Sequence, residues 1–211
     1  LLSSRVLHKK LSRALAEDPP DLEKIRACAG QLNELNEGML RRMDELYRTV
    51  KNNAITLTPV SVEQLALTAV ERFHGKYPDR SVSVELTTHR QALADLGHLS
   101  EAICNLLCNG FEAALQAGRD NPRVELLARG ERMWTVLEVR DNGKGIPAEL
   151  QNKIFEPFFT SKNTNYNWGM GLYYVRKIVK SHLGRLRLES RPDQGTSFFI
   201  MLPLYDAHEK E

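Results

Sequence analysis

Asp141-Asn-Gly-Lys-Gly-Ile-Pro147 is the stretch around which the rest of the chain is organised. It follows Trp134-Thr-Val-Leu-Glu-Val-Arg140, an apolar run that predicts a buried strand. An acidic residue at a strand end, followed by two glycines spaced by one residue, lets the backbone approach a flat ligand while the carboxylate accepts a hydrogen bond from it. This arrangement suits an adenine amino group.

The segment upstream, Leu99 to Leu115, predicts a helix with one apolar face. Its other face carries acids and amides but no base: Glu101, Asn105, Asn109 and Glu112. Oxygen ligands of this kind suit a metal ion better than they suit direct binding of phosphate. We therefore expect a metal ion on this face of the helix.

Downstream, Trp168-Gly-Met-Gly-Leu172 opens another apolar-periodic segment. Glycines at a helix start leave backbone N–H groups free to face an anion. A Gly-x-Gly pair alone is usually just a turn. Here it is one of three separate stretches that together supply parts for adenine, metal and phosphate.

These stretches resemble the sequence boxes of sensor histidine kinases. In order, the N box, first glycine box, F box and second glycine box correspond to Asn105-Leu-Leu-Cys-Asn109, Asp141-Asn-Gly-Lys-Gly145, Ile154-Phe-Glu-Pro-Phe-Phe159 and Gly169-Met-Gly171, and a final Gly195-Thr196 resembles the last glycine motif. Five ordered motifs, spread over about Pro59 to Leu204, are far more specific than any one of them.

The resemblance implies the Bergerat ATP-binding fold, which gyrase and heat-shock chaperone ATPases share. This is an α+β sandwich with a mixed, mostly antiparallel sheet of about five strands and helices on one face. We expect this domain over residues 55–211 and a helical hairpin over residues 1–54.

Composition is ordinary for a soluble globular protein, with 42% hydrophobic and 27% charged residues in a chain of 211. The 29 basic and 27 acidic side chains include no long basic block, so nucleic-acid binding is not indicated. No apolar run approaches the roughly 20 residues of a membrane span, so we expect no membrane contact by this part of the protein and any membrane segment to lie outside this sequence. We expect this part to be the cytoplasmic portion of a sensor, membrane-bound or not.

Three cysteines, Cys28, Cys104 and Cys108, fall in apolar-periodic segments. An odd number fits reduced, buried thiols better than a disulfide framework. Cys104 and Cys108 lie one helical turn apart, but no neighbouring His or second cysteine pair completes a zinc site. We interpret all three as small packing residues.

Two helices are expected in the hairpin. Leu7, Leu11 and Leu15 recur every four residues, so the first helix ends near Ala16, and the second runs from about Pro19 to Lys51. The second helix carries the three-four apolar spacing of a bundle seam. Two helices alone bury too little surface, so we expect two hairpins to pair as a four-helix bundle and form a homodimer.

His8 is the only histidine of the hairpin. Sensor histidine kinases place their phosphoacceptor histidine on the first bundle helix, followed by an acid and, a few residues later, a proline. Lys9-Lys-Leu-Ser-Arg-Ala14 has neither feature, and His8 lies only thirteen residues before Asp21. We therefore expect the acceptor to precede Leu1.

Further elements follow from local signals. Ser61 with Gln64 predicts a capping box at a helix start. Alternation predicts strands over Ser81–Leu86, Gln91–Asp95, Arg123–Ala128, Met133–Arg140, Arg185–Ser190 and Ser197–Leu202, with helices from Pro147 and over Met170–His182. The polar run Thr160–Asn167 is expected to be a mobile loop over the nucleotide, the ATP lid of the family.

The resemblance also implies roles for individual residues. Asn109 is expected to bind a Mg²⁺ ion that bridges the ATP phosphates, with Asn105 and Glu112 supporting it. Glu112 also fits a surface helix acid. Lys162 of the lid is expected to touch the terminal phosphate, although a solvated loop charge is nearly as good an interpretation.

The remaining site residues surround the base and the phosphates. Asp141 is expected to accept from the adenine amino group, and Thr196 to join through its hydroxyl or through water. The others shape the adenine slot or present backbone N–H groups to the phosphates: Gly143, Gly145, Ile146, Gly169, Met170, Gly171 and Leu172.

One position separates the functional classes of this superfamily. Its ATP-hydrolysing members and serine-kinase anti-sigma factors carry Glu four residues before the metal-binding Asn, where this chain has Asn105. Without that carboxylate, transfer to an imidazole is favoured over activation of water. The implied function is therefore a histidine kinase that serves a response regulator receiver domain; the alternatives are a Bergerat serine kinase or ATPase, and a nucleotide-binding pseudokinase module.

Overall fold

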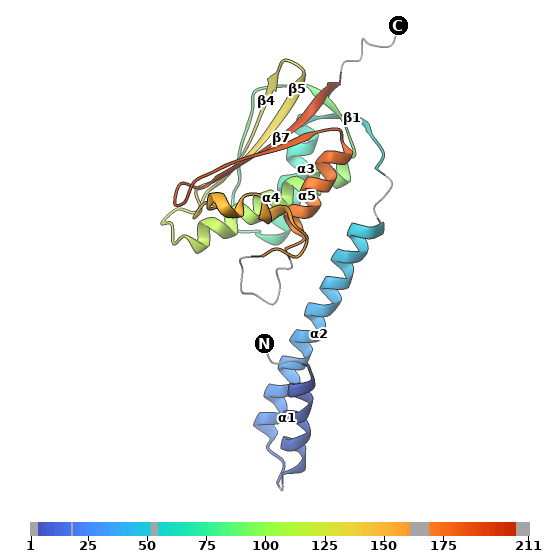
Figure 1. The fold of residues 1–211 in the computed structure, drawn as a ribbon, viewed down its shortest axis with the longest axis vertical. Coiled ribbons are helices and arrows are strands. Elements are labelled where there is room, and N and C mark those ends of the chain that lie inside the picture. Colours follow the sequence, from blue (N-terminus) through green and yellow to red (C-terminus); the bar gives the residue numbers. More distant parts are fainter. Residues whose placement is uncertain (1–3, 18, 52–54, 161–168, 206–211) are drawn as a thin grey trace. The chain divides into compact units, whose positions relative to one another are not determined.

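The computed structural model describes residues 4–17, 19–51, 55–160 and 169–205. The described residues form two compact units: residues 4–17 and 19–51 belong to one, and residues 55–160 and 169–205 to the other (Figure 1). The first unit is a helical hairpin and the second is an α+β domain.

The hairpin consists of α1 (Ser4–Ala16) and α2 (Leu22–Lys51). Its second helix begins at Leu22 rather than near Pro19, because Asp21 caps it: the carboxylate Oδ1 of Asp21 accepts from the Lys24 N–H at 2.9 Å. Leu7, Ala14 and Cys28 are buried between the helices. This capped turn and its small apolar seam account for the hairpin.

The second unit is built on a seven-stranded sheet among the described residues. Its strands are β1 (Thr58–Ser61), β2 (Ser83–Leu86), β3 (Gln91–Ala94), β4 (Val124–Glu131), β5 (Trp134–Asp141), β6 (Arg185–Ser190) and β7 (Thr196–Tyr205). The order is β1-β3-β7-β5-β4-β2, and β6 also pairs with β7. Only the β2–β4 pair is parallel within the described sheet.

The sheet has more than the expected number of about five strands, and β1 is the one strand that none of the six predicted stretches covers. Pro59 lies inside β1 and weakens its strand signal, but β1 is an edge strand, where proline is tolerated. β1 pairs with β3 from Thr58↔Ala94 to Ser61↔Gln91. The mixed, mostly antiparallel character of the sheet is as expected.

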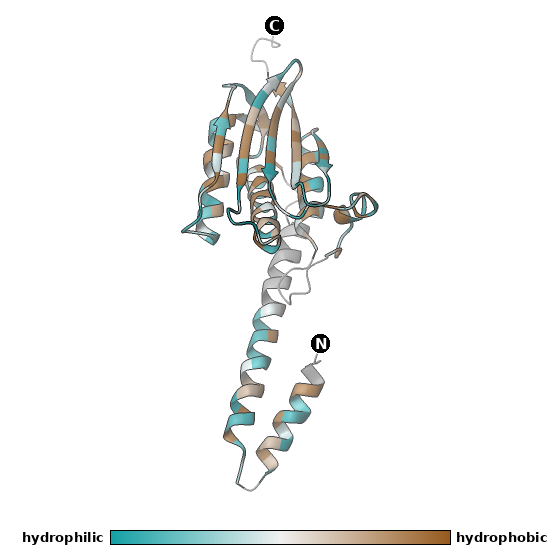
Figure 2. Ribbon diagram, turned by 90° about the vertical axis from the view of Figure 1, so that its left-hand side faces the viewer, coloured by the Kyte–Doolittle hydropathy of each residue, from teal (hydrophilic) through white to brown (hydrophobic). Residues whose placement is uncertain are grey.

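Three helices lie on the same side of this sheet: α3 (Val62–Lys76), α4 (Leu96–Gln116) and α5 (Gly171–Ser181) (Figures 1 and 2). Short 3₁₀ helices follow β5 as η1 (Ala148–Leu150) and η2 (Lys153–Phe155). The predicted capping box starts α3: the Gln64 N–H donates to Ser61 Oγ at 3.2 Å, and the Ser61 N–H donates to Gln64 Oε1 at 3.4 Å.

The core lies between these helices and the sheet. Alternate residues of the central strands are fully buried with the apolar faces of the helices, including Leu126, Leu137, Ile200, Leu202, Phe73, Leu99, Ile103, Leu107 and Ile178. Each side chain of this size contributes about 1.5–3 kcal/mol by leaving water. The core therefore holds α4 against β4 and β5, and α5 against α4 and β6.

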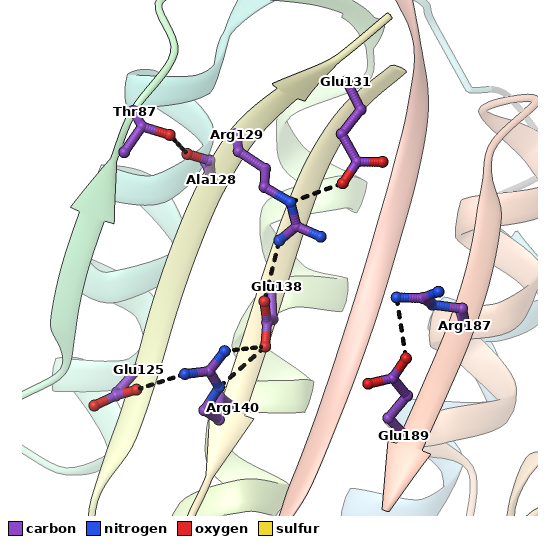
Figure 3. A network of polar contacts seen from close by, with 9 residues as sticks. All are labelled: Thr87, Glu125, Ala128, Arg129, Glu131, Glu138, Arg140, Arg187 and Glu189. Atoms are coloured by element: carbon purple, nitrogen blue, oxygen red, sulfur yellow. Dashed lines mark hydrogen bonds and ion pairs between the residues drawn. The ribbon is translucent and has the colours of Figure 1, made fainter. Parts of the chain in front are cut away.

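The opposite face of the sheet is covered by its own side chains (Figure 3). Glu138, only 4% exposed, accepts from Arg129 at 3.1 Å and from Arg140 at 2.8 Å. The Arg187 guanidinium lies 4.4 Å from the ring centroid of buried Phe199. Paired charges and cation–π contacts thus shield the apolar residues on this side.

Candidate nucleotide-binding site

Asp141 ends β5 and is only 7% exposed. Its carboxylate Oδ1 accepts a hydrogen bond from the Gly143 N–H at 2.8 Å. Burial raises the pKa of Asp141 to about 6, although hydrogen bonds from the backbone of Gly143 and Thr196 act in the opposite direction. The carboxylate is therefore ionised at neutral pH and can accept a further hydrogen bond.

α4 comes unusually close to this carboxylate. A Cβ atom added to Gly110 would lie 3.0 Å from the Asp141 Cβ and 3.2 Å from its Oδ2. At Gly143, an added Cβ would lie 2.8 Å from the Ala113 Cβ. The end of β5 and α4 thus lie on two sides of Asp141. Where they touch, there is room for no side chain larger than that of glycine.

Two further glycines join the loops behind Asp141. Gly145 and Gly195 have φ angles of +70° and +84°, which non-glycine residues rarely adopt. An added Cβ would collide with the carbonyl oxygen of Arg191 at the first position and with that of Asp141 at the second. The loop after β5 and the β6–β7 turn therefore pack backbone against backbone.

The hydroxyls of Ser190 and Thr196 hold the loop that follows Asp141. Ser190 Oγ accepts from the Ile146 N–H at 2.8 Å and lies 2.9 Å from Thr196 Oγ1. Gln151 Nε2 donates to the Ile146 carbonyl at 3.0 Å. Ile146 belongs to the loop that follows Asp141, and Ser190 joins this loop to Thr196. The motif analysis missed Ser190 and Gln151 because no motif contains them.

Asn105, Asn109 and Glu112 are half-buried on α4. An added Cβ on Gly171 would lie 3.8 Å from Asn109 Nδ2, so the amide of Asn109 faces the first turn of α5. Glu112 Oε1 accepts from the Tyr77 hydroxyl of α3 at 2.8 Å, which ties this carboxylate to the α3 side.

No group of three or more His, Cys, Asp and Glu side chains in the described part of the chain could hold a metal ion. Mg²⁺ does not require such a group, because it keeps several waters and binds proteins through one or two oxygen ligands plus substrate phosphates. An amide oxygen on α4 beside the start of α5 fits that mode. A zinc-type centre does not fit the described residues.

The second glycine box forms the start of α5. Met170 is the N-cap residue of α5, and its side chain makes no capping bond to the first N–H groups of the helix. Gly169 has a φ of +66°, and Leu172 packs against the core. Gly169 and Met170 thus directly precede α5, and Gly171 and Leu172 are its first residues.

Of the expected lid, Thr160–Asn167, all but Thr160 lies outside the described residues, Lys162 included, as does Trp168. The F box before it is described: Ile154 is buried, and Phe155 packs edge-on against Phe198 with ring centroids 6.3 Å apart. The F box therefore anchors the start of this segment to the core.

The cysteines are free and buried, as expected. Cys104 Sγ and Cys108 Sγ lie 3.9 Å apart on α4. None of the helices in the described ranges has both the length and the apolar composition needed to cross a membrane.

Comparison with known proteins agrees with this geometry. Residues 94–206 match the family of histidine kinase-, DNA gyrase B- and HSP90-like ATPases. Sensor kinase CckA of Brucella abortus is 31% identical over 96% of this chain and 22% of its own length. Adaptive-response sensory kinase SasA of Synechocystis is 30% identical over 90% of this chain and 52% of its own.

The chain thus spans between about a fifth and a half of the length of these relatives. Among solved structures, the mycobacterial sensor histidine kinase MprB is similar, with 27% identity and a TM-score of 0.60 over 70% of this chain and 97% of that one. The expected α+β fold class is confirmed. The chain belongs to the histidine kinase-, DNA gyrase B- and HSP90-like ATPase family and contains an ATP-binding domain of the sensor histidine kinase type.

Proposed function

We propose that this chain transfers the γ-phosphoryl group of Mg-ATP to a histidine, as the catalytic region of a two-component sensor kinase. The observation that supports this most is the convergence of three elements. α4 contacts Asp141 through Gly110 and contacts the start of α5 through Asn109 and Gly171. A nucleotide along α4 would have its base at one contact and its phosphates at the other.

The base would bind at the Asp141 end. The ionised carboxylate accepts from the adenine amino group, and its hydrogen bond with Gly143 keeps it oriented. Ile146 and Gly145 line the slot, while Thr196 contributes its hydroxyl beside Ser190. The Asp141 carboxylate would then select adenine, because guanine carries a carbonyl at that position and cannot donate a hydrogen bond to it.

The phosphates would bind at the start of α5, where the backbone N–H groups of Gly169 to Leu172 would donate to them. Asn109 would hold Mg²⁺, with Asn105 and Glu112 in support; the metal would supply charge neutralisation for phosphoryl transfer. Lys162 stays a proposed contact to the terminal phosphate. Asn105, Asn109 and Lys162 are the residues that we expect to act nearest the reacting group.

The acceptor is proposed to be an imidazole because Asn105 provides no carboxylate to activate water. A neutral histidine is already nucleophilic at physiological pH. The phosphoryl group would pass onward to an aspartate of a response regulator receiver domain in the cytoplasm.

The hairpin is proposed to form a homodimer through a four-helix bundle. It carries a groove of about 590 Å³ lined by His8, Leu11, Leu32, Leu35, Met39 and three smaller residues. Met39, at the edge of this groove, is 61% exposed, and a second hairpin packed on the groove would bury it.

Calorimetric titration with ATP, with Mg²⁺ and with EDTA, tests the binding step. Incubation of the full-length protein with γ-labelled ATP, followed by mapping of acid-labile phosphate, tests the transfer step. We expect magnesium-dependent binding and label on histidine. Steady ATP hydrolysis without label would instead favour the ATPase alternative, and no heat at millimolar nucleotide would exclude both.

A further inference from the structure

Arg119 lies in the loop between α4 and β4, and its guanidinium contacts three backbone carbonyls. Nε donates to the Asn142 carbonyl at 2.8 Å. Nη2 donates to the Gly143 carbonyl at 3.4 Å and to the Asp193 carbonyl at 2.6 Å. One half-buried side chain thus joins the end of α4 to two loops that are distant in sequence.

Both of these loops flank Asp141. Asn142 and Gly143 follow it directly, and the Gly143 N–H donates to its carboxylate at 2.8 Å. Asp193 belongs to the β6–β7 turn, which ends at Gly195 against the Asp141 carbonyl. The Gly143 N–H and the Asn142 carbonyl belong to the same peptide group, so Arg119, which donates to that carbonyl at 2.8 Å, helps set the direction of this N–H and with it that of the Asp141 carboxylate.

Other bonds join these loops pairwise. The Asp193 N–H donates to the Lys144 carbonyl at 2.7 Å, and the Arg123 N–H donates to Asn142 Oδ1 at 2.9 Å. Arg119 differs because a planar guanidinium presents several donors in a fixed geometry and contacts both loops at once. A lysine ammonium lacks that fork.

We propose that Arg119 is a positioning residue for adenine recognition: it holds the Asn142–Gly143 backbone so that the Asp141 carboxylate faces the 6-amino group. Arg119 touches neither the base nor the phosphates in this proposal. The inference rests on the proposed adenine site and adds that selectivity for the amino group depends on a residue outside all five motifs.

Titration calorimetry of the whole chain with ATP and with purine riboside triphosphate, which lacks the 6-amino group, tests this. A hydrogen bond to a charged group corresponds to a preference of about 10- to 150-fold, which we expect for the unaltered protein. Arg119→Ala should reduce the preference to within about threefold by weakening ATP binding, while the affinity for purine riboside triphosphate stays within about threefold.

Two further variants sharpen the test. Arg119→Lys keeps the charge but not the fork, so we expect the same loss of preference; it also serves if the alanine variant does not fold. Arg123→Ala is the matched control, because its side chain is 62% exposed and its bond to Asn142 uses the backbone. We expect this variant to keep the preference, and melting without nucleotide checks that each variant is folded.

The outcomes separate the possible failures. If both Arg119 variants keep the preference for ATP, the positioning role is wrong. If both nucleotides weaken equally, Arg119 only stabilises the loops, and the proposal is also overturned. If the unaltered protein shows no preference and Asp141→Asn changes nothing, the adenine site itself is misassigned.

Discussion

Asp141→Asn separates the cost of burying a charge from its benefit in binding adenine. The substitution keeps the size of the side chain and an oxygen for the Gly143 N–H. It replaces the second carboxylate oxygen with an NH₂ group, which would meet the adenine amino group donor to donor. We therefore expect stability and affinity to change in opposite directions.

The stability term follows from the pKa of Asp141, which burial raises from 3.8 to about 6. At about 1.4 kcal/mol per pKa unit, ionisation costs the folded state about 3 kcal/mol. Because the folded pKa is raised, this cost is absent below about pH 3.8 and fully present above about pH 6. Asp141→Asn should therefore stabilise the nucleotide-free protein by up to about 3 kcal/mol at pH 7.5, with a smaller gain at pH 4.5.

The binding term has the opposite sign. Loss of a charge-assisted hydrogen bond corresponds to about 1.5–3 kcal/mol, or about 10- to 150-fold in affinity for ATP. For the unaltered protein, affinity should likewise fall as the pH drops through about 6 and Asp141 becomes protonated.

Urea unfolding at pH 7.5 and 4.5, together with ATP titration at pH 7.5, measures both terms. Unchanged ATP affinity in Asp141→Asn would refute the adenine assignment. A variant that is less stable at pH 7.5 than the unaltered protein would refute the claim that the buried charge is costly.

Three other predictions concern the fold around the site. Thr135 Oγ1 is buried without a hydrogen-bond partner among the described residues, so Thr135→Val should raise the free energy of unfolding by about 1–2 kcal/mol in urea titrations; a loss would show that the hydroxyl is paired. His182 Nε2 accepts from the Asp95 N–H at 2.9 Å, and burial lowers the pKa of His182. The free energy of unfolding should therefore be highest above the ordinary histidine pKa of about 6.5 and should decline as the pH falls below it. A His182→Gln variant that keeps this decline would contradict its assignment to His182. Gly195→Ala should cost at least about 1–3 kcal/mol in thermal melts, because its φ is +84° and the new methyl would collide with backbone, whereas Gly75→Ala in α3, with open space around it, should be neutral or slightly stabilising.

Local signals predicted the elements that depend on neighbours in sequence. The capping box of Ser61 and Gln64 formed as expected, because both partners lie within one helical turn. The strand over Arg185–Ser190 has the expected bounds, since its alternation is regular. The start of α2 moved from about Pro19 to Leu22, because the helix begins after its cap, Asp21, and not at the prolines before it.

The motifs likewise predicted the residues that surround Asp141, but not the contacts that hold them. Ser190, Gln151 and Arg119 act through bonds to residues 5 to 74 positions away in the chain. Such bonds depend on tertiary packing and leave no periodicity in the sequence. The roles of Asn105, Asn109, Glu112 and Lys162 stay predictions until nucleotide binding is measured.

The register of the sheet places the candidate adenine site on its last row. Val124, Asp141, Thr196 and Ser190 are cross-strand neighbours on β4, β5, β7 and β6. A slip of β7 by one residue would turn Thr196 to the opposite face and dismantle the slot. Bound nucleotide would therefore stabilise four strand ends against local unfolding. The amide hydrogens of this row should exchange more slowly when ATP is added.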